Sequence, residues 1–165
     1  MENIMKLELE GYPDRDNATV ANVAWAVREI ASANGPTFLV VELGDEAYAQ
    51  AAGTQGRYVI ESRTKFGEGF QHLRVCHPLA GRDGKAVVYY RQQCERHRPR
   101  RCPLNIKKSE VSTLAEVEQA LVHFARTGKR DSRLQWRDVT AQYIKDRNRP
   151  AEDDDDEITQ IVPGG

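Results

Sequence analysis

The chain has 165 residues, with 24 Lys and Arg against 25 Asp and Glu, and its formal net charge is −1. This length fits one domain that is able to bury a hydrophobic core. The hydrophobic fraction of 39% and the charged fraction of 30% are typical of a globular protein with a polar surface. The near-neutral balance of the whole chain indicates no particular class of partner.

The N-terminus and the cysteines indicate the compartment. The first residues, MENIMKLELEGYPD, contain no apolar stretch and no small-residue cleavage site, so we expect no secretory signal. No apolar run approaches the length of a membrane-spanning helix. The three cysteines are an odd number, whereas a disulfide framework normally needs an even one. We therefore expect a cytoplasmic protein with free thiols and no membrane partner.

The first half of the sequence predicts several strands and one helix. Residues 5–10 (MKLELE) alternate apolar and polar side chains, which is typical of a half-buried strand. From Val20 to Ala31 apolar residues recur at steps of three and four, which predicts an amphipathic helix with Asp16 or Asn17 as its N-cap. Further strands are predicted at 38–43, 57–63 and 70–77, with a short segment at 48–51 between two turns.

The second half contains a basic segment and two predicted helices. Residues 81–84 (GRDG) are a hairpin signal, which predicts that a strand at 86–92 pairs with the strand at 70–77. We interpret residues 91–108, which hold seven Lys and Arg, as an irregular basic insertion. A capping box, TLAE at 113–116, begins a helix that Gly128 ends. A last short helix, packed by Trp136, is expected within 134–144.

This order of elements predicts an α+β fold. We expect an antiparallel sheet of about five or six strands with two or three helices packed on one face. One domain should cover residues 1–150, and the acidic tail 151–165, with EDDDDE at 152–157, should be disordered. The residues that share the apolar faces, and that we expect in the core, are Val23, Val27, Ile30, Leu39, Val41, Leu121, Phe124 and Trp136.

Two groups of residues could hold a ligand. Cys94, His97 and Cys102 are possible zinc ligands by residue type. Their spacing is poor and no CxxC pair is present, so we expect no metal and no other cofactor. The basic segment 91–108 could contact phosphates, with Tyr89 and Tyr90 stacking on bases. No recognised nucleic-acid motif accompanies it. A nucleic-acid-binding regulatory module and a zinc-stabilised adaptor stay as alternatives, although we expect neither ligand.

The usual signatures of catalysis are missing from the sequence. It contains no GxSxG elbow, no HExxH, no P-loop and no GxGxxG. Gly67-Glu68-Gly69 is too short for a phosphate cradle, and His123 lies beside the apolar stripe of its helix, which is typical of a boundary residue. We therefore predict that the protein is not an enzyme.

Five segments between residues 37 and 140 carry a resemblance to a known class. They are Tyr48-Ala-Gln50-Ala-Ala-Gly53, GRYVIE at 56–61, Gln71-His72-Leu73-Arg74, LAEVEQALVHF at 114–124 and LQWRD at 134–138. Together they resemble small immunity proteins of bacterial polymorphic-toxin systems. The basic segment 91–108 is longer than the connection that those proteins have at this position.

The resemblance implies a cytoplasmic inhibitor that binds one cognate toxin domain and blocks its active site or substrate path. The interface would use an exposed face of the sheet, because alternation places neighbouring charged residues on one side of a strand. Arg and Tyr are the residue types that dominate interface energetics. The candidate partner-binding residues are Tyr48, Arg57, Glu61, Arg63, His72, Arg74, Arg96, Arg98, Arg100 and Arg101.

Overall fold

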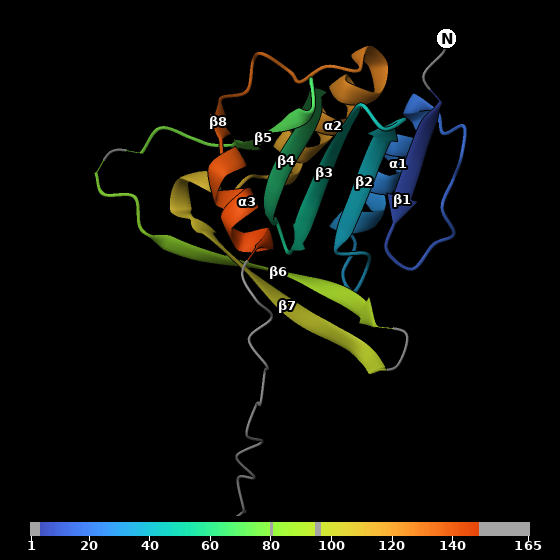
Figure 1. Cartoon of the computed structure of the whole chain (residues 1–165). Coiled ribbons are helices and arrows are strands. Elements are labelled where there is room, and N and C mark those ends of the chain that lie inside the picture. Colours follow the sequence, from blue (N-terminus) through green and yellow to red (C-terminus); the bar gives the residue numbers. More distant parts are fainter. Residues whose placement is uncertain (1–3, 80, 95–96, 149–165) are drawn as a thin grey trace, which may run out of the picture.

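The computed structural model describes residues 4–79, 81–94 and 97–148, and it confirms the α+β fold (Figure 1). A six-stranded antiparallel sheet has the order β1-β2-β3-β4-β5-β8, and a separate two-stranded sheet joins β6 to β7. The strands are β1 (Met5–Leu9), β2 (Phe38–Leu43), β3 (Ala47–Thr54), β4 (Arg57–Phe66), β5 (Gly69–Val75), β6 (Lys85–Cys94), β7 (His97–Lys107) and β8 (Trp136–Asp138). Within the described ranges, no helix is both long enough and apolar enough to cross a membrane.

Two amphipathic helices, α1 (Val20–Ala31) and α2 (Leu114–Thr127), cover one face of the large sheet. The predicted capping box of α2 is confirmed, and Gly128 ends the helix with φ of 69°. The predicted N-cap of α1 is wrong. Thr19, not Asp16 or Asn17, caps this helix, because the first helical turn begins at Val20 and the Thr19 hydroxyl accepts a hydrogen bond from the amide of Asn22.

The hydrophobic core lies between these two helices and the sheet. The predicted core residues other than Trp136 are all buried there, and β1, β3 and β4 add further apolar side chains. Trp136 is only partly buried, and its indole Nε1 donates a hydrogen bond to the carbonyl oxygen of Asp131, 2.9 Å away. Trp136 lies on β8 and not in a helix, so the last helix begins later than predicted.

That last helix, α3 (Thr140–Arg147), lies on the opposite face of the sheet from α1 and α2. Its Tyr143 stacks on His72 of β5, whose side chain points away from the core. The prediction of helices on one face therefore holds for α1 and α2 alone. We call the face that carries α3 the second face.

The basic segment forms regular structure, which corrects two predictions. β6 does not pair with β5, because β5 pairs with β4 and β8. Residues 97–107 are not irregular, since they form β7 and pair with β6 as a long hairpin. The physical reason is alternation: Val88 and Ile106 are buried against Val59 of β4, so one side of the hairpin packs on the second face. The tail 151–165 lies outside the described residues, so its disorder stays a prediction.

Candidate functional site

A groove lies on the second face, between the large sheet and the hairpin. Its volume is about 430 Å³. The residues whose side chains or backbone line it are Phe38, Leu39, Val40, Gln50, Ala51, Ala52, Val59, Glu61, Tyr90, Gln92 and Leu104. We call this cavity the groove. Its lining is mainly apolar, with Gln50, Glu61 and Gln92 as its polar residues.

Strand alternation explains the apolar floor of the groove. Val40, Ala52 and Val59 occupy neighbouring strands at positions that point away from the core. From the hairpin, Tyr90 and Leu104 form the facing wall, and Tyr90 meets Phe38 edge to face with 6.4 Å between ring centroids. The small side chain of Ala52 leaves space where a larger residue would fill the cavity.

Glu61 is the one carboxylate among the residues that line the groove. Its Oε1 accepts hydrogen bonds from Arg74 Nε at 2.9 Å and Nη2 at 2.6 Å. Its Oε2 accepts one from Gln50 Nε2 at 2.8 Å and lies 3.1 Å from His72 Nε2. Burial alone would raise the pKa of Glu61, but the His72 hydrogen bond and the Arg74 charge outweigh it and lower the pKa to about 2.

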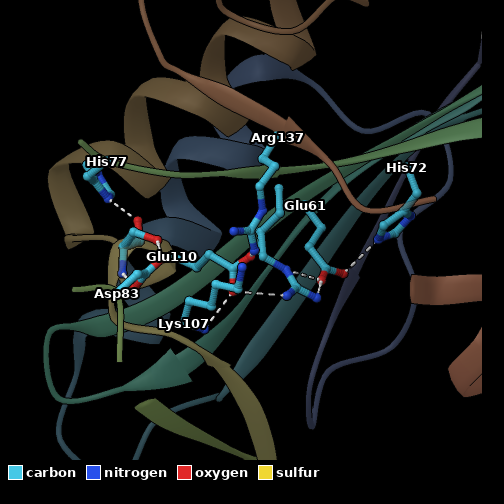
Figure 2. A network of polar contacts seen from close by, with 9 residues as sticks. Glu61, His72, His77, Asp83, Lys107, Glu110 and Arg137 are labelled. Carbon is cyan, nitrogen blue, oxygen red and sulfur yellow. Dashed lines mark hydrogen bonds and ion pairs between the residues drawn. The ribbon is translucent and has the colours of Figure 1, made fainter. Parts of the chain in front are cut away.

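The polar contacts of Glu61 continue into the protein (Figure 2). Arg74 Nη1 donates to Glu110 Oε2 at 3.2 Å, and Arg137 pairs with the other oxygen of Glu110. Glu110 is fully buried and also accepts a hydrogen bond from the amide of Lys107 at 2.7 Å. This network ties β4, β5 and β8 to the end of β7, so it holds the base of the hairpin against the sheet.

A second set of contacts fixes the loop that leads into the hairpin (Figure 2). Asp83 accepts hydrogen bonds from the hydroxyl and the amide of Ser109, at 2.5 and 3.1 Å. His77 Nδ1 lies 2.8 Å from the Ser109 carbonyl oxygen, and its Nε2 pairs with Glu116 of α2. The hairpin is therefore anchored at its base by polar contacts and along its length by apolar packing.

An aromatic cluster lies beside the groove, under α3. The Arg63 guanidinium lies over three rings, with its Cζ 5.3 Å from the centroid of Tyr48, 4.1 Å from Phe70 and 4.5 Å from Tyr143. Burial raises the pKa of Tyr48 to about 12. The cluster connects α3 to β3, β4 and β5, and cation–π contacts of this kind stabilise a cation that is removed from water.

The outer side of the hairpin is basic. Lys85, Tyr89, Arg101, Asn105 and Lys107 are exposed there, at the alternate positions to those that pack on the sheet. The Arg101 Cζ lies 3.7 Å from the centroid of the Tyr89 ring. We call this side the basic face. Like-charged residues lie directly opposite each other on it, which costs stability unless an anion is near.

The structure brings some predicted binding residues together and hides others. His72 and Arg74 both contact Glu61. His72 is fully buried, so the expectation that it lies on an exposed surface is wrong. The register of the sheet explains these contacts. β4 and β5 pair directly, with Glu61 opposite Arg74, so opposite charges on the second face neutralise each other. Tyr48 and Arg63 belong to the aromatic cluster.

The remaining predicted residues are Arg57 of β4 and four arginines of the basic segment 91–108. Arg57, Arg100 and Arg101 are exposed. Of Arg98 only the backbone, within β7, is described, and Arg96 lies outside the described residues. The role of all these residues in partner binding stays a prediction.

The possible metal ligands do not form one site. Cys94 pairs with His97 across the hairpin, but Cys102 lies opposite Tyr90, five residues further along β7, roughly 16 Å away for an extended strand. Among the described residues, no group of three or more His, Cys, Asp or Glu could hold a metal ion.

No protein-family profile matches this chain. No curated protein and no solved structure matches it either. The resemblance to immunity proteins therefore rests on the sequence segments alone.

Sequence reasoning missed residues that shape the site. Glu110 and Arg137 are far from Glu61 in the sequence, Gln50 lies in one of the five segments of the resemblance but is not a candidate binding residue, and Tyr143 lies in no such segment. The alternation of the strands could have placed Gln50 on the same side as Tyr48. The contact of Glu110 with Arg74 and Arg137 depends on how the short helix at 108–110 is folded, so no local pattern predicts it.

Proposed function

We propose that this protein is an inhibitor of the immunity type, which binds a bacterial toxin domain one to one through the groove and the adjoining hairpin. The observation that carries the proposal is the groove, an apolar cavity with a few polar residues, held open by a buried polar network. Binding surfaces concentrate their energy in such pockets, where one partner side chain is fully removed from water. Burying one large apolar side chain there contributes roughly 1.5–3 kcal/mol.

The chemistry of Glu61 favours binding over catalysis. A general base needs a free lone pair and a pKa near the working pH. Both oxygens of Glu61 already have partners, and its pKa is about 2. Its neighbours hold one another in place, which supports a rigid binding surface.

Co-expression tests this function. The toxin domain encoded beside this protein should arrest growth when expressed alone and should be harmless when this protein is present. Val40→Arg would place a charged side chain in the groove, and it should abolish protection while the variant stays folded by circular dichroism. Glu118→Arg, an exposed position on α2, is the matched control and should protect like the wild type.

Two results would contradict the proposal. In the first, the Val40→Arg variant is folded and protects fully, so the groove is not the interface. In the second, the wild type protects against no toxin domain encoded beside it. Reversing the charges of Glu61 and Arg74, by contrast, would not test the interface, because these residues hold the fold together.

The basic face favours one second candidate, the binding of nucleic acid. Tyr89 and Arg101 combine a ring and a cation, as in sites for single-stranded nucleic acid. Binding of this kind weakens steeply with added salt for any sequence, whereas a cognate protein complex is selective. Titration of a single-stranded RNA at two salt concentrations separates the two functions.

A further inference from the structure

The basic face borders two cavities whose described lining contains no acidic residue. One, of about 520 Å³, lies between the loop after α1 and the hairpin, and the other, of about 400 Å³, lies between the β3–β4 turn and the hairpin. Tyr89 and Arg101 line both, and Arg57 lines the second. Arg91 also reaches the first, but Glu10 holds it with Nε 2.8 Å from Oε1. Arg57 and Arg101 are thus exposed cations without an acid in the lining beside them.

The chain itself contains a matching anion. Residues 152–157 read EDDDDE, so six of the 25 acidic residues follow one another, and the remainder of the chain carries a net positive charge. Asp and Glu carboxylates bind Arg through paired, charge-assisted hydrogen bonds. The charges of the acidic segment and the basic face are therefore complementary.

The acidic segment follows closely on the end of α3. α3 ends at Arg147, and in Figure 1 its last turn lies toward the same end of the sheet as the hairpin. Residue 152 follows Asn148 by four residues, and 157 by nine, which span at most about 14 and 31 Å.

The free edge of β7 makes docking through side chains the favoured mode. β7 contains two prolines, Pro99 and Pro103, and Pro103 lies opposite Tyr89. Proline has no N–H to donate, so an added strand would lack a hydrogen-bond donor at each of these positions. An anion would instead meet the guanidinium groups.

We propose that the acidic segment 152–157 binds its own chain at Tyr89 and Arg101 of the basic face and at the neighbouring Arg57 of β4. Bound there, it neutralises Arg57 and Arg101 and shields this face from phosphate-bearing molecules. A partner that uses the basic face has to displace it. This contact does not depend on the toxin, so it stands or falls separately from the proposed function.

Amide chemical shifts of the full chain test the contact directly. In the neutral-tail variant, residues 152–157 read QNNNNQ in place of EDDDDE. We expect this change to shift the amide resonances of Gln55, Arg57, Tyr89 and Arg101 at low salt. In the wild type, salt at about 1 M should cause the same shifts, because the Debye length falls to about 3 Å.

Charge reversal gives the matched control. Arg57→Glu with Arg101→Glu should remove the response to tail neutralisation, whereas Arg126→Glu with Lys129→Glu, exposed at the end of α2, should leave it intact. The proposal is overturned if tail neutralisation leaves the hairpin resonances unchanged, or if the shifts occur around Arg126 and Lys129 instead.

A binding measurement tests the shielding. A single-stranded poly-uridine oligonucleotide, used as a phosphate probe at low salt, should bind the neutral-tail variant on the order of tenfold more tightly than the wild type. Adding Arg57→Glu and Arg101→Glu to that variant should cancel the gain. Equal affinity of the wild type and the neutral-tail variant would show that the tail does not cover this face.

Discussion

The ring of His72 stacks on the ring of Tyr143, with 4.6 Å between centroids and 23° between planes. This contact joins α3 to the second face. No residue of α3 is fully buried, so the helix depends on Tyr143, which also meets Phe70 edge to face and lies under Arg63. A helix of eight residues has little stability of its own and forms where tertiary contacts fix it.

Replacing Tyr143 with Ala should therefore release α3 and leave the rest of the fold intact. We expect amide hydrogen exchange within residues 140–147 to become faster, while exchange in α1 and α2 is unchanged. Ile144→Ala, at a side chain that is 44% exposed on the same helix, is the control and should change exchange little. Unchanged protection of α3 in the Tyr143 variant would show that other contacts hold the helix.

The Glu61 carboxylate should make stability depend on acid pH. Its pKa in the folded protein is about 2, below the ordinary value of 4.5, so the carboxylate stabilises the fold above pH 4.5. This contribution should be lost as the pH falls from 4.5 toward 2. Glu61→Gln should lower Tm at pH 7 and flatten the dependence of Tm on pH across that window.

Glu118→Gln, at an exposed position, is the control for this pH profile and should follow the wild type. If the Glu61→Gln variant loses stability in acid as steeply as the wild type, other carboxylates govern the acid transition.

Gly53 should be essential for the β3–β4 turn. Its φ is 145°, and an added Cβ would lie 2.1 Å from the Arg57 carbonyl oxygen, which is backbone and cannot move aside alone. Gly53→Ala should lower the free energy of unfolding by roughly 2–5 kcal/mol in urea denaturation. Gly44→Ala is the control, since its φ is also positive but no atom lies within 4 Å of the added Cβ. It should cost about 1–2 kcal/mol.

The hairpin should depend on a small apolar cluster. Val88 is 2% exposed and packs with Val59 and Ile106. A two-stranded hairpin is marginal alone in water, so Val88→Ala should speed amide exchange throughout β6 and β7. Val87→Ala, half-buried on the other side of the same strand, should have a smaller effect. Equal effects would mean that the hairpin does not rely on the sheet.

Phe124 tests the main core. It is 2% exposed, and Phe124→Ala should cost about 3–5 kcal/mol of unfolding free energy. Phe66, 81% exposed, gives a matched control of the same residue type, and its replacement by Ala should change the free energy by less than about 0.5 kcal/mol. A similar loss in both variants would contradict the assignment of the core.

Local patterns in the sequence predict much of the fold. The apolar periodicity of α1 and the capping box of α2 specify those helices, because both signals act within a few residues. Alternation predicts β1, β4 and β5 and the sides on which Arg57, Glu61 and Arg63 lie. Half-buried strands show this period of two wherever one side packs on a core.

The segment after Gly84 shows why prediction failed there. Its prolines and arginines indicate a loop, yet Arg101 and Pro103 occupy exposed positions on the outer side of β7. The inner residues, such as Leu104 and Ile106, alternate regularly, but their burial depends on the second face of the sheet. The predicted pairing of β5 with β6 is also wrong. β5 pairs with β8 instead, and β8 comes from a distant part of the sequence.

The sequence by itself determined the α+β class, both long helices and the faces of the central strands, because these follow from hydrogen bonds and side-chain spacing along a short stretch of chain. Only the tertiary structure decided the groove, the Glu61–Arg74–Glu110 network and the place of Tyr143 over His72. Each of these joins residues that are far apart in the sequence. Their contacts depend on strand order and on the angle at which the hairpin and α3 pack, which no local pattern encodes.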